Sequence, residues 1–144
     1  SKELIDTINA GVQTTFSYTI KICRSGFLYN NELEKVAIHK RISYDIWSET
    51  YIIESDFQKK SVMYLKNIDD TLNNLKSITK IKIVDISRLS KDNKYYFKTR
   101  LTIKITQLNS YMHFIYNILS IFRYKTSYIS GSSFKLSEII NQKE

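Results

Sequence analysis

Hydrophobic and polar residues alternate along residues 95–106, which read YYFKTRLTIKIT. Because successive side chains of a β-strand point to opposite faces, this pattern predicts a strand with one apolar face and one basic, hydroxyl-rich face. The apolar set is Tyr95, Phe97, Thr99, Leu101, Ile103 and Ile105. The basic set is Tyr96, Lys98, Arg100, Thr102, Lys104 and Thr106. We expect the chain to be arranged around this strand, with the apolar set inside and the lysines and arginine outside.

The N-terminal part of the chain changes from a helical to a strand pattern at Gly11. Apolar residues at helical spacing predict a short helix over residues 2–10, and Gly11 is well placed to end it. Residues 12–23 then alternate and predict a long strand with one buried face. Cys23 falls on the more polar face of this strand, where we expect a bystander thiol. The buried set is Val12, Thr14, Phe16, Tyr18, Ile20 and Ile22.

The next part of the chain predicts a meander of antiparallel strands with short links. Lys40 interrupts the apolar face of the first strand and predicts a bend or bulge there. The expected strands cover residues 36–46, 50–54 and 61–65, with turns at residues 47–49 and 55–56.

An amphipathic helix is predicted over residues 67–78. Asn67 is a good N-cap, and Asp69 and Asp70 favour the positive end of the helix dipole. Its apolar stripe is Ile68, Leu72, Leu75 and Ile78. Beyond this helix we expect a strand over residues 80–86, a polar loop over residues 87–93 and a last strand around Gly131 that contains Tyr128, Ile129 and Phe134.

The apolar segment 109–122 contains the run YMHFIYNILSIF at residues 111–122, which is apolar on nearly every side of a helix. The run is too short to span a bilayer. It is typical either of a buried helix or cross-over, or of an exposed patch that docks on a partner or a membrane. Arg123 and Lys125 follow the run and suit an anionic bilayer edge. The partner- or lipid-binding candidates are therefore Met112, Phe114, Ile115, Leu119, Phe122, Arg123 and Lys125.

The length of 144 residues and the hydrophobic share of 42% predict a single folded domain over residues 1–144. Together with the patterns, they predict an α+β fold that is mostly antiparallel β. We expect a β-sandwich or a strongly curved sheet, with one amphipathic helix at residues 67–78, a short N-terminal helix and the apolar segment 109–122.

The net charge of +8 favours anionic surroundings, although an AT-rich genome would also enrich lysine. The anion-facing candidates are Lys98, Arg100, Lys104 and Arg41. A basic strand face is most often simply solvated. The chain lacks the aromatic- and glycine-rich signature of RNA-binding sheets, so we do not expect a nucleic-acid partner.

No motif in the sequence points to a reaction, and we expect no enzyme, no metal and no cofactor. Glycine occurs only three times, which excludes a phosphate-binding loop of the P-loop or dinucleotide type. His39 and His113 lie in unrelated contexts, which argues against a zinc site. The acidic pairs Glu32/Glu34 and Asp69/Asp70 are interpreted as a solvated strand entry and a helix N-terminus. Only a pocket that collects Cys23, a histidine and a carboxylate would revive an enzyme.

The order of segments resembles a bacterial family of envelope proteins catalogued as domain-of-unknown-function family 4390. The resemblance is carried by INAGVQTTFSY, EKVAIHKRISYDIWSETYII, IDDTLNNLKSITKIKIVDISRLSKDNKYYFKTRLTI and LNSYMHFIYNILSIFRYKTSY, and runs from about Leu4 to Tyr128. It implies an exported protein of the periplasm or cell envelope, often encoded beside a membrane sensor histidine kinase of the nitrogen-regulation type. It implies no catalytic residues.

Two hypotheses about function follow from the pattern and the resemblance. The leading one is a non-enzymatic envelope domain that binds a protein partner, as an accessory to a membrane sensor or as a subunit of a larger assembly. The alternative is a peripheral protein that binds lipid, an anionic membrane surface or an apolar ligand. Neither the export signal nor a membrane-spanning run is present in the 144 residues, so the envelope location depends on the resemblance alone.

Overall fold

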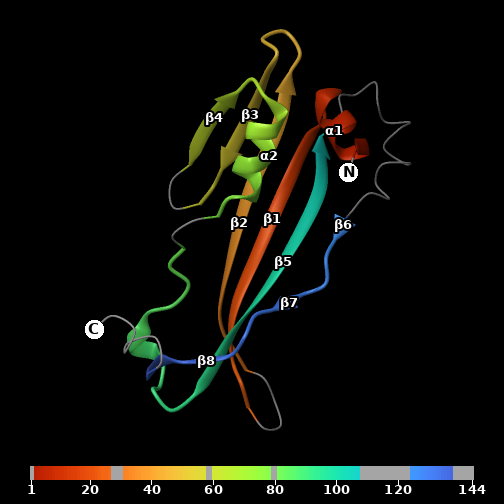
Figure 1. The fold of residues 1–144 in the computed structure, drawn as a ribbon. Helices are drawn as coiled ribbons and strands as arrows, with labels where there is room; N and C mark the ends of the chain where they lie inside the picture. Colours follow the sequence, from red (N-terminus) through yellow and green to blue (C-terminus); the bar gives the residue numbers. More distant parts are fainter. Residues whose placement is uncertain (1, 27–30, 58–59, 79–80, 108–123, 138–144) are drawn as a thin grey trace. The chain divides into compact units, whose positions relative to one another are not determined.

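The computed structural model describes residues 2–26, 31–57, 60–78, 81–107 and 124–137, and these form an α+β fold with a mostly antiparallel sheet (Figure 1). Within these ranges the strand order is β4-β3-β2-β1-β5-β6, and β7 and β8 also pair with β5. The predicted fold class is confirmed.

The elements have the following bounds. The helices are α1 (Lys2–Asn9), α2 (Ile68–Lys76) and the short 3-10 helix η1 (Ile86–Arg88). The strands are β1 (Gln13–Arg24), β2 (Asn31–Asp45), β3 (Thr50–Ser55), β4 (Ser61–Leu65), β5 (Lys94–Gln107), β6 (Tyr124–Lys125), β7 (Ile129–Ser130) and β8 (Phe134–Lys135). The strand predicted at residues 95–106 is therefore confirmed as β5, and the last predicted strand is present as two short pieces, β7 and β8.

The chain divides into two compact units, and β1, β2 and β5 each contribute residues to both. The first unit takes its described residues from Ser1–Ser17, Ile38–Thr79 and Leu101–Lys125. The second takes them from Tyr18–Ala37, Lys80–Arg100 and Thr126–Glu144.

In the first unit, α2 is fixed to one face of the sheet through Lys40. Lys40 lies opposite Ser55 in the β2–β3 pairing, which is regular as far as Asp45. Its Nζ donates hydrogen bonds to the main-chain oxygens of Asn74, at 2.5 Å, and Ser77, at 2.8 Å, at the C-terminal end of α2. A cation is favourable there because the last carbonyl groups of a helix have no partners within it. The charged Lys40 thus binds the end of α2 from within the apolar face. The register with β3 is regular from Lys40 to Asp45, so β2 has no bulge opposite β3.

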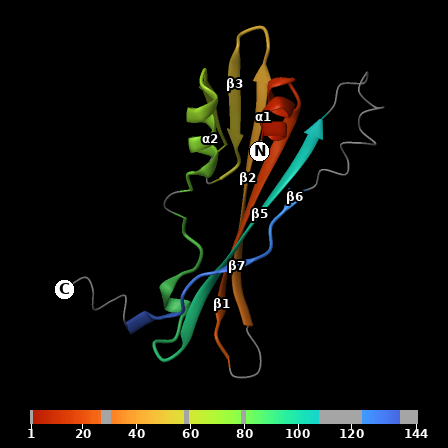
Figure 2. The same ribbon diagram turned by 45° about the vertical axis from the view of Figure 1, so that its right-hand side comes forward.

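The helix α1 covers the same face. Tyr44 lies opposite Tyr51, two positions along β2 from Ile42 and four from Lys40, so all of them share a face. The hydroxyl group of Tyr51 donates to Asn9 Oδ1 at 2.7 Å, at the end of α1. Figure 2 shows α2 beside β3. Among the described residues of this unit, the buried side chains are Ile8, Val12, Thr14, Phe16, Ile38, Ile42, Tyr51, Ile53, Thr71 and Leu75.

The caps of both helices form as the sequence predicts. Gly11 ends α1 with a φ of 80°, in the left-handed region that favours glycine. The side chain of Asn67 accepts a hydrogen bond from the main-chain N–H of Asp69, at 2.7 Å, and so caps α2.

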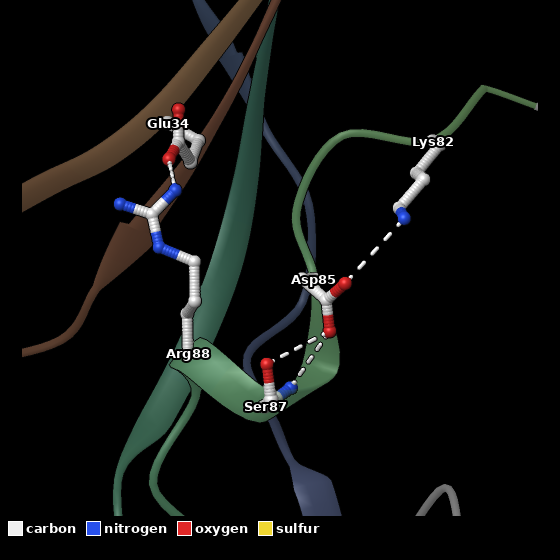
Figure 3. A network of polar contacts seen from close by, with 5 residues as sticks. All are labelled: Glu34, Lys82, Asp85, Ser87 and Arg88. Carbon is white, nitrogen blue, oxygen red and sulfur yellow. Dashed lines mark hydrogen bonds and ion pairs between the residues drawn. The ribbon is translucent and has the colours of Figure 1, made fainter.

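In the second unit, the strand expected at residues 80–86 is wrong. Residues 81–85 are irregular and lead into η1. Asp85 is the reason, because its Oδ1 accepts hydrogen bonds from the main-chain N–H and the Oγ of Ser87, which turns the chain (Figure 3). Lys82 adds an ion pair to Asp85 at 3.4 Å. These short-range polar contacts override the alternating apolar pattern.

The second unit also buries side chains from both alternating sets of β1 and β5. Ile22 and Cys23 are adjacent and both buried, as are Tyr95 and Tyr96. The expectation that Cys23 and Tyr96 face outward is therefore wrong for this unit. Thr99, which belongs to the apolar set, is exposed. The rings of Tyr95 and Phe97 pack on Phe134 of β8, with centroid distances of 6.3 and 5.4 Å.

Candidate functional site

Most of the predicted partner-binding segment lies outside the described residues. This applies to Met112, Phe114, Ile115, Leu119, Phe122 and Arg123, and to His113. Lys125 is described: it belongs to β6, lies opposite Thr102 of β5 and is exposed. The roles predicted for this segment remain predictions.

The four anion-facing candidates are separated between the two units. Lys98 and Arg100 belong to the second unit, whereas Lys104 and Arg41 belong to the first. Arg41 forms an ion pair with Glu54 of β3, its partner in the register, at 3.3 Å. The charge of Arg41 is thus balanced within its own sheet.

Lys98 and Arg100 are half-buried and stack on tyrosine rings, contrary to the expectation that they project into solvent. The guanidinium Cζ of Arg100 lies 4.3 Å from the ring centroid of Tyr128, and Lys98 Nζ lies 5.5 Å from that of Tyr96. Arg100 Nε is buried and makes no hydrogen bond within the described part of the chain. Cations over aromatic faces are attracted by the ring quadrupole. This face of β5 is therefore partly covered by Tyr96 of the strand itself and by Tyr128, which precedes β7.

The structure adds Lys21 to this cluster, a residue that the sequence reasoning did not single out. Its Nζ lies 5.0 Å from the Tyr128 ring centroid and 2.5 Å from Glu32 Oε2 on β2. The hydrogen bond to Glu32 raises the pKa of Lys21, and one to Tyr128 adds to this effect. Glu34 is paired with Arg88 in the same unit (Figure 3). Glu32 and Glu34 thus lie at the start of β2, as interpreted from the sequence, and the structure adds an ion pair to each of them.

In the first unit, Ser17 and His39 place a hydroxyl group beside an imidazole ring. Ser17 Oγ lies 2.8 Å from His39 Nδ1, while the carboxylate of Asp56 accepts from the main-chain N–H of His39, also at 2.8 Å. A nucleophile–base pair needs a group that orients the base through its other ring nitrogen, and Asp56 contacts the main chain instead. Within the described residues, no group of three or more His, Cys, Asp and Glu side chains is arranged to hold a metal ion.

The apolar surface with the clearest structural context is the edge strand β4. It ends the described strand order, and three consecutive side chains are exposed to solvent: Val62 at 53%, Met63 at 43% and Tyr64 at 67%. The sequence predicted the strand with its correct bounds. The sequence does not indicate that β4 lies at an edge, because SVMYL carries neither of the usual marks of an edge strand, a charge or a proline.

A second apolar feature is the turn between β2 and β3, where the side chains of Ile46 and Trp47 are 60% and 97% exposed. Asp45 fixes this turn: its carboxylate accepts from the main-chain N–H of Trp47, at 3.0 Å, and from Ser48 Oγ, at 2.8 Å. The hydrogen bond from Ser48, followed by that from Trp47, lowers the pKa of Asp45. An indole ring is thus held in water on an ordered turn.

These features define a class: an α+β domain whose mostly antiparallel sheet carries two helices on one face of its first unit and ends in an exposed apolar edge strand. In the described ranges, no helix combines the length and apolar character needed to cross a membrane.

The chain belongs to the family described as Domain of unknown function (DUF4390), whose profile matches residues 1–128. The resemblance found in the sequence is thereby confirmed. No curated protein matches the chain, and no solved structure does.

Proposed function

We propose that this chain is a non-enzymatic domain of the bacterial envelope, in the periplasm, that binds a protein partner. The partner is a membrane sensor or a larger assembly to which the chain contributes a subunit. The proposed location is supported by the likeness to exported envelope proteins. The observation that carries the binding proposal is the exposed apolar surface of β4.

The side chains on β4 suit a protein interface better than they suit water. Val62, Met63 and Tyr64 are each at least 43% exposed although they are consecutive in an ordered strand. Complete burial of a side chain of the Val or Met class contributes about 1.5–3 kcal/mol. Tyrosine is among the residues that dominate interface energetics, because its ring is apolar and its hydroxyl group finds a partner.

Capture from native membranes tests this proposal. The wild-type chain and a Val62→Ser/Tyr64→Ser variant are used as bait, and cross-linked partners are identified by mass spectrometry. The matched control is Ile86→Ser, because Ile86 is 61% exposed but belongs to the second unit. We expect the β4 variant to lose a partner that the wild-type chain and the control both retain. Equal recovery of all partners by a folded β4 variant would contradict the proposal.

A second candidate function, peripheral binding to an anionic membrane, is favoured by the turn that carries Trp47. Tryptophan is enriched at membrane interfaces, and Trp47 is 97% exposed on a chain of net charge +8. Flotation with anionic liposomes at low and high salt, using the wild-type chain and Trp47→Ser, tests this function. Absence of flotation at low salt removes it.

A further inference from the structure

We infer that β4 accepts an extended segment of a different protein as an added β-strand, and that this segment carries acidic residues on both sides of a short apolar stretch. The inference rests on the proposed partner-binding function and specifies its mode and the chemistry of the partner. It is carried by the edge position of β4, its composition and the two lysines that flank it.

The edge of β4 has the main-chain groups that strand addition requires. β4 pairs on one side with β3 in regular antiparallel register, from Ser61 opposite Ser55 to Leu65 opposite Tyr51. No strand among the described residues pairs with its other side. An edge of this kind presents a row of main-chain N–H and C=O groups that can template another strand. Natural edge strands are usually protected by a charge, a proline or a bulge, and β4 has neither charge nor proline within its bounds.

The strand is held in place before any partner binds. Met63 lies opposite Ile53, which is 3% exposed in the core of the first unit. The sulfur atom of Met63 also accepts from Asn74 Nδ2 of α2, at 3.2 Å. A preorganised edge strand loses little conformational entropy on binding, so more of the interaction energy appears as affinity.

The charges that flank β4 select the kind of partner. Lys60 and Lys66 are both exposed, and no ion pair to either of them is found within the described chain. In an antiparallel pair of two copies centred on Met63, Lys60 of each copy would face Lys66 of the other. Like charges directly opposite each other destabilise a strand pair. The edge therefore disfavours a second copy of the chain and favours a strand with carboxylates at those two places.

The side chains of β4 also specify the pattern of the added strand. Val62 and Tyr64 alternate with Met63, so they point to one face of the sheet while Met63 points toward α2. Residues of the partner opposite Val62 and Tyr64 bury the larger exposed area. We therefore expect the partner segment to have apolar residues at these alternate positions, and acidic residues beyond them at each end.

A pair of synthetic peptides tests the charge selection. The acidic probe is Glu-Thr-Val-Thr-Val-Thr-Glu, and its control replaces both glutamates by lysine. Binding to the full chain is measured by fluorescence anisotropy at low and high salt. We expect the acidic probe to bind at least about tenfold more tightly at low salt, with the difference reduced at high salt. In the Lys60→Glu/Lys66→Glu variant the preference should reverse.

A second pair of probes tests for strand addition itself. The main-chain nitrogens of the acidic probe are methylated at either of two alternating sets of positions, which leaves every side chain unchanged. Only one set points its N–H groups toward a neighbouring strand, so one methylated probe should lose binding and the other should retain it. Amide shifts in the NMR spectrum should concentrate at residues 61–65.

Several outcomes of these two peptide experiments would overturn the inference. Equal binding of acidic and lysine-flanked probes, equal effects of the two methylation patterns, or no binding of any probe would each exclude it. Dimers that depend on β4 would show that a second copy is the occupant instead. None of these results affects the capture experiment, where a partner lost by the Val62→Ser/Tyr64→Ser variant would still support the proposed function with another binding mode.

Discussion

Two adjacent isoleucines on β3 allow a direct test of how the first unit is packed. Ile53 is 3% exposed and lies opposite Ile42, which is fully buried, on the face that α1 and α2 cover. Ile52 points to the other face and is half-buried. The same substitution, isoleucine to alanine, at the two positions changes the same atoms and the same strand propensity. Any difference between the two variants therefore reports the covering of the two faces.

The expected magnitude follows from the atoms that are removed. The substitution deletes about three methylene equivalents, worth about 0.8 kcal/mol each when fully buried, or about 2.4 kcal/mol. At Ile53 the surrounding core leaves a cavity that adds about 1 kcal/mol. At Ile52 only part of the transfer energy is lost, and water fills the space that is vacated. We expect Ile53→Ala to lower the free energy of unfolding by about 3–4 kcal/mol and Ile52→Ala by about 1 kcal/mol.

Urea unfolding followed by far-UV circular dichroism measures both values. Trp47 is a poor fluorescence reporter because its side chain is already 97% exposed in the folded chain. Because the chain contains two compact units, amide hydrogen exchange in β2 and β3 provides a local second measurement. Equal destabilisation by the two variants would refute the assignment of both helices to the Ile53 face.

Three further predictions concern a cap, an ionisable tyrosine and the cation–aromatic cluster. Asn67→Ala removes the side chain that caps α2 and should lower the midpoint of thermal unfolding by the equivalent of about 1 kcal/mol. Asn67→Asp should restore the midpoint, and an unchanged midpoint in the alanine variant would exclude the cap. Burial raises the pKa of Tyr18 from 10.0 to about 12. The stability that depends on this shift is therefore complete below pH 10 and is lost as the pH rises toward 12. The loss should be smaller in Tyr18→Phe, and parallel pH profiles of the free energy of unfolding for the two chains would contradict the shift. Tyr128→Leu keeps the apolar area but removes the aromatic ring beside Arg100 and Lys21, and should destabilise the second unit by about 1 kcal/mol. Hydrogen exchange in β5 measures this effect, and unchanged exchange there would show that the stacking contributes nothing.

The parts of this protein that the sequence determined are those governed by local rules. The alternation in β5 and β1, the N-cap at Asn67 and the glycine that ends α1 depend on neighbours within a few residues. Such patterns specify the type of each element and the direction of its side chains, because strand and helix periods follow from backbone geometry alone. The family resemblance likewise needed only the order of the segments.

Only the tertiary structure decided what covers each face. Lys40 interrupts an apolar pattern, and the tertiary structure explains this charge because Lys40 donates hydrogen bonds to main-chain oxygens at the C-terminal end of α2. Tyr96 alternates with the apolar set of β5 and is nevertheless buried, with Lys98 over its ring. The edge position of β4 is likewise invisible in SVMYL, because a strand's own residues do not state whether it has one neighbour or two. The spacing of hydrophobic residues in a sequence determines the directions in which side chains point. Their burial, and the exposure of a strand at the edge of a sheet, depend on contacts between residues far apart in the chain.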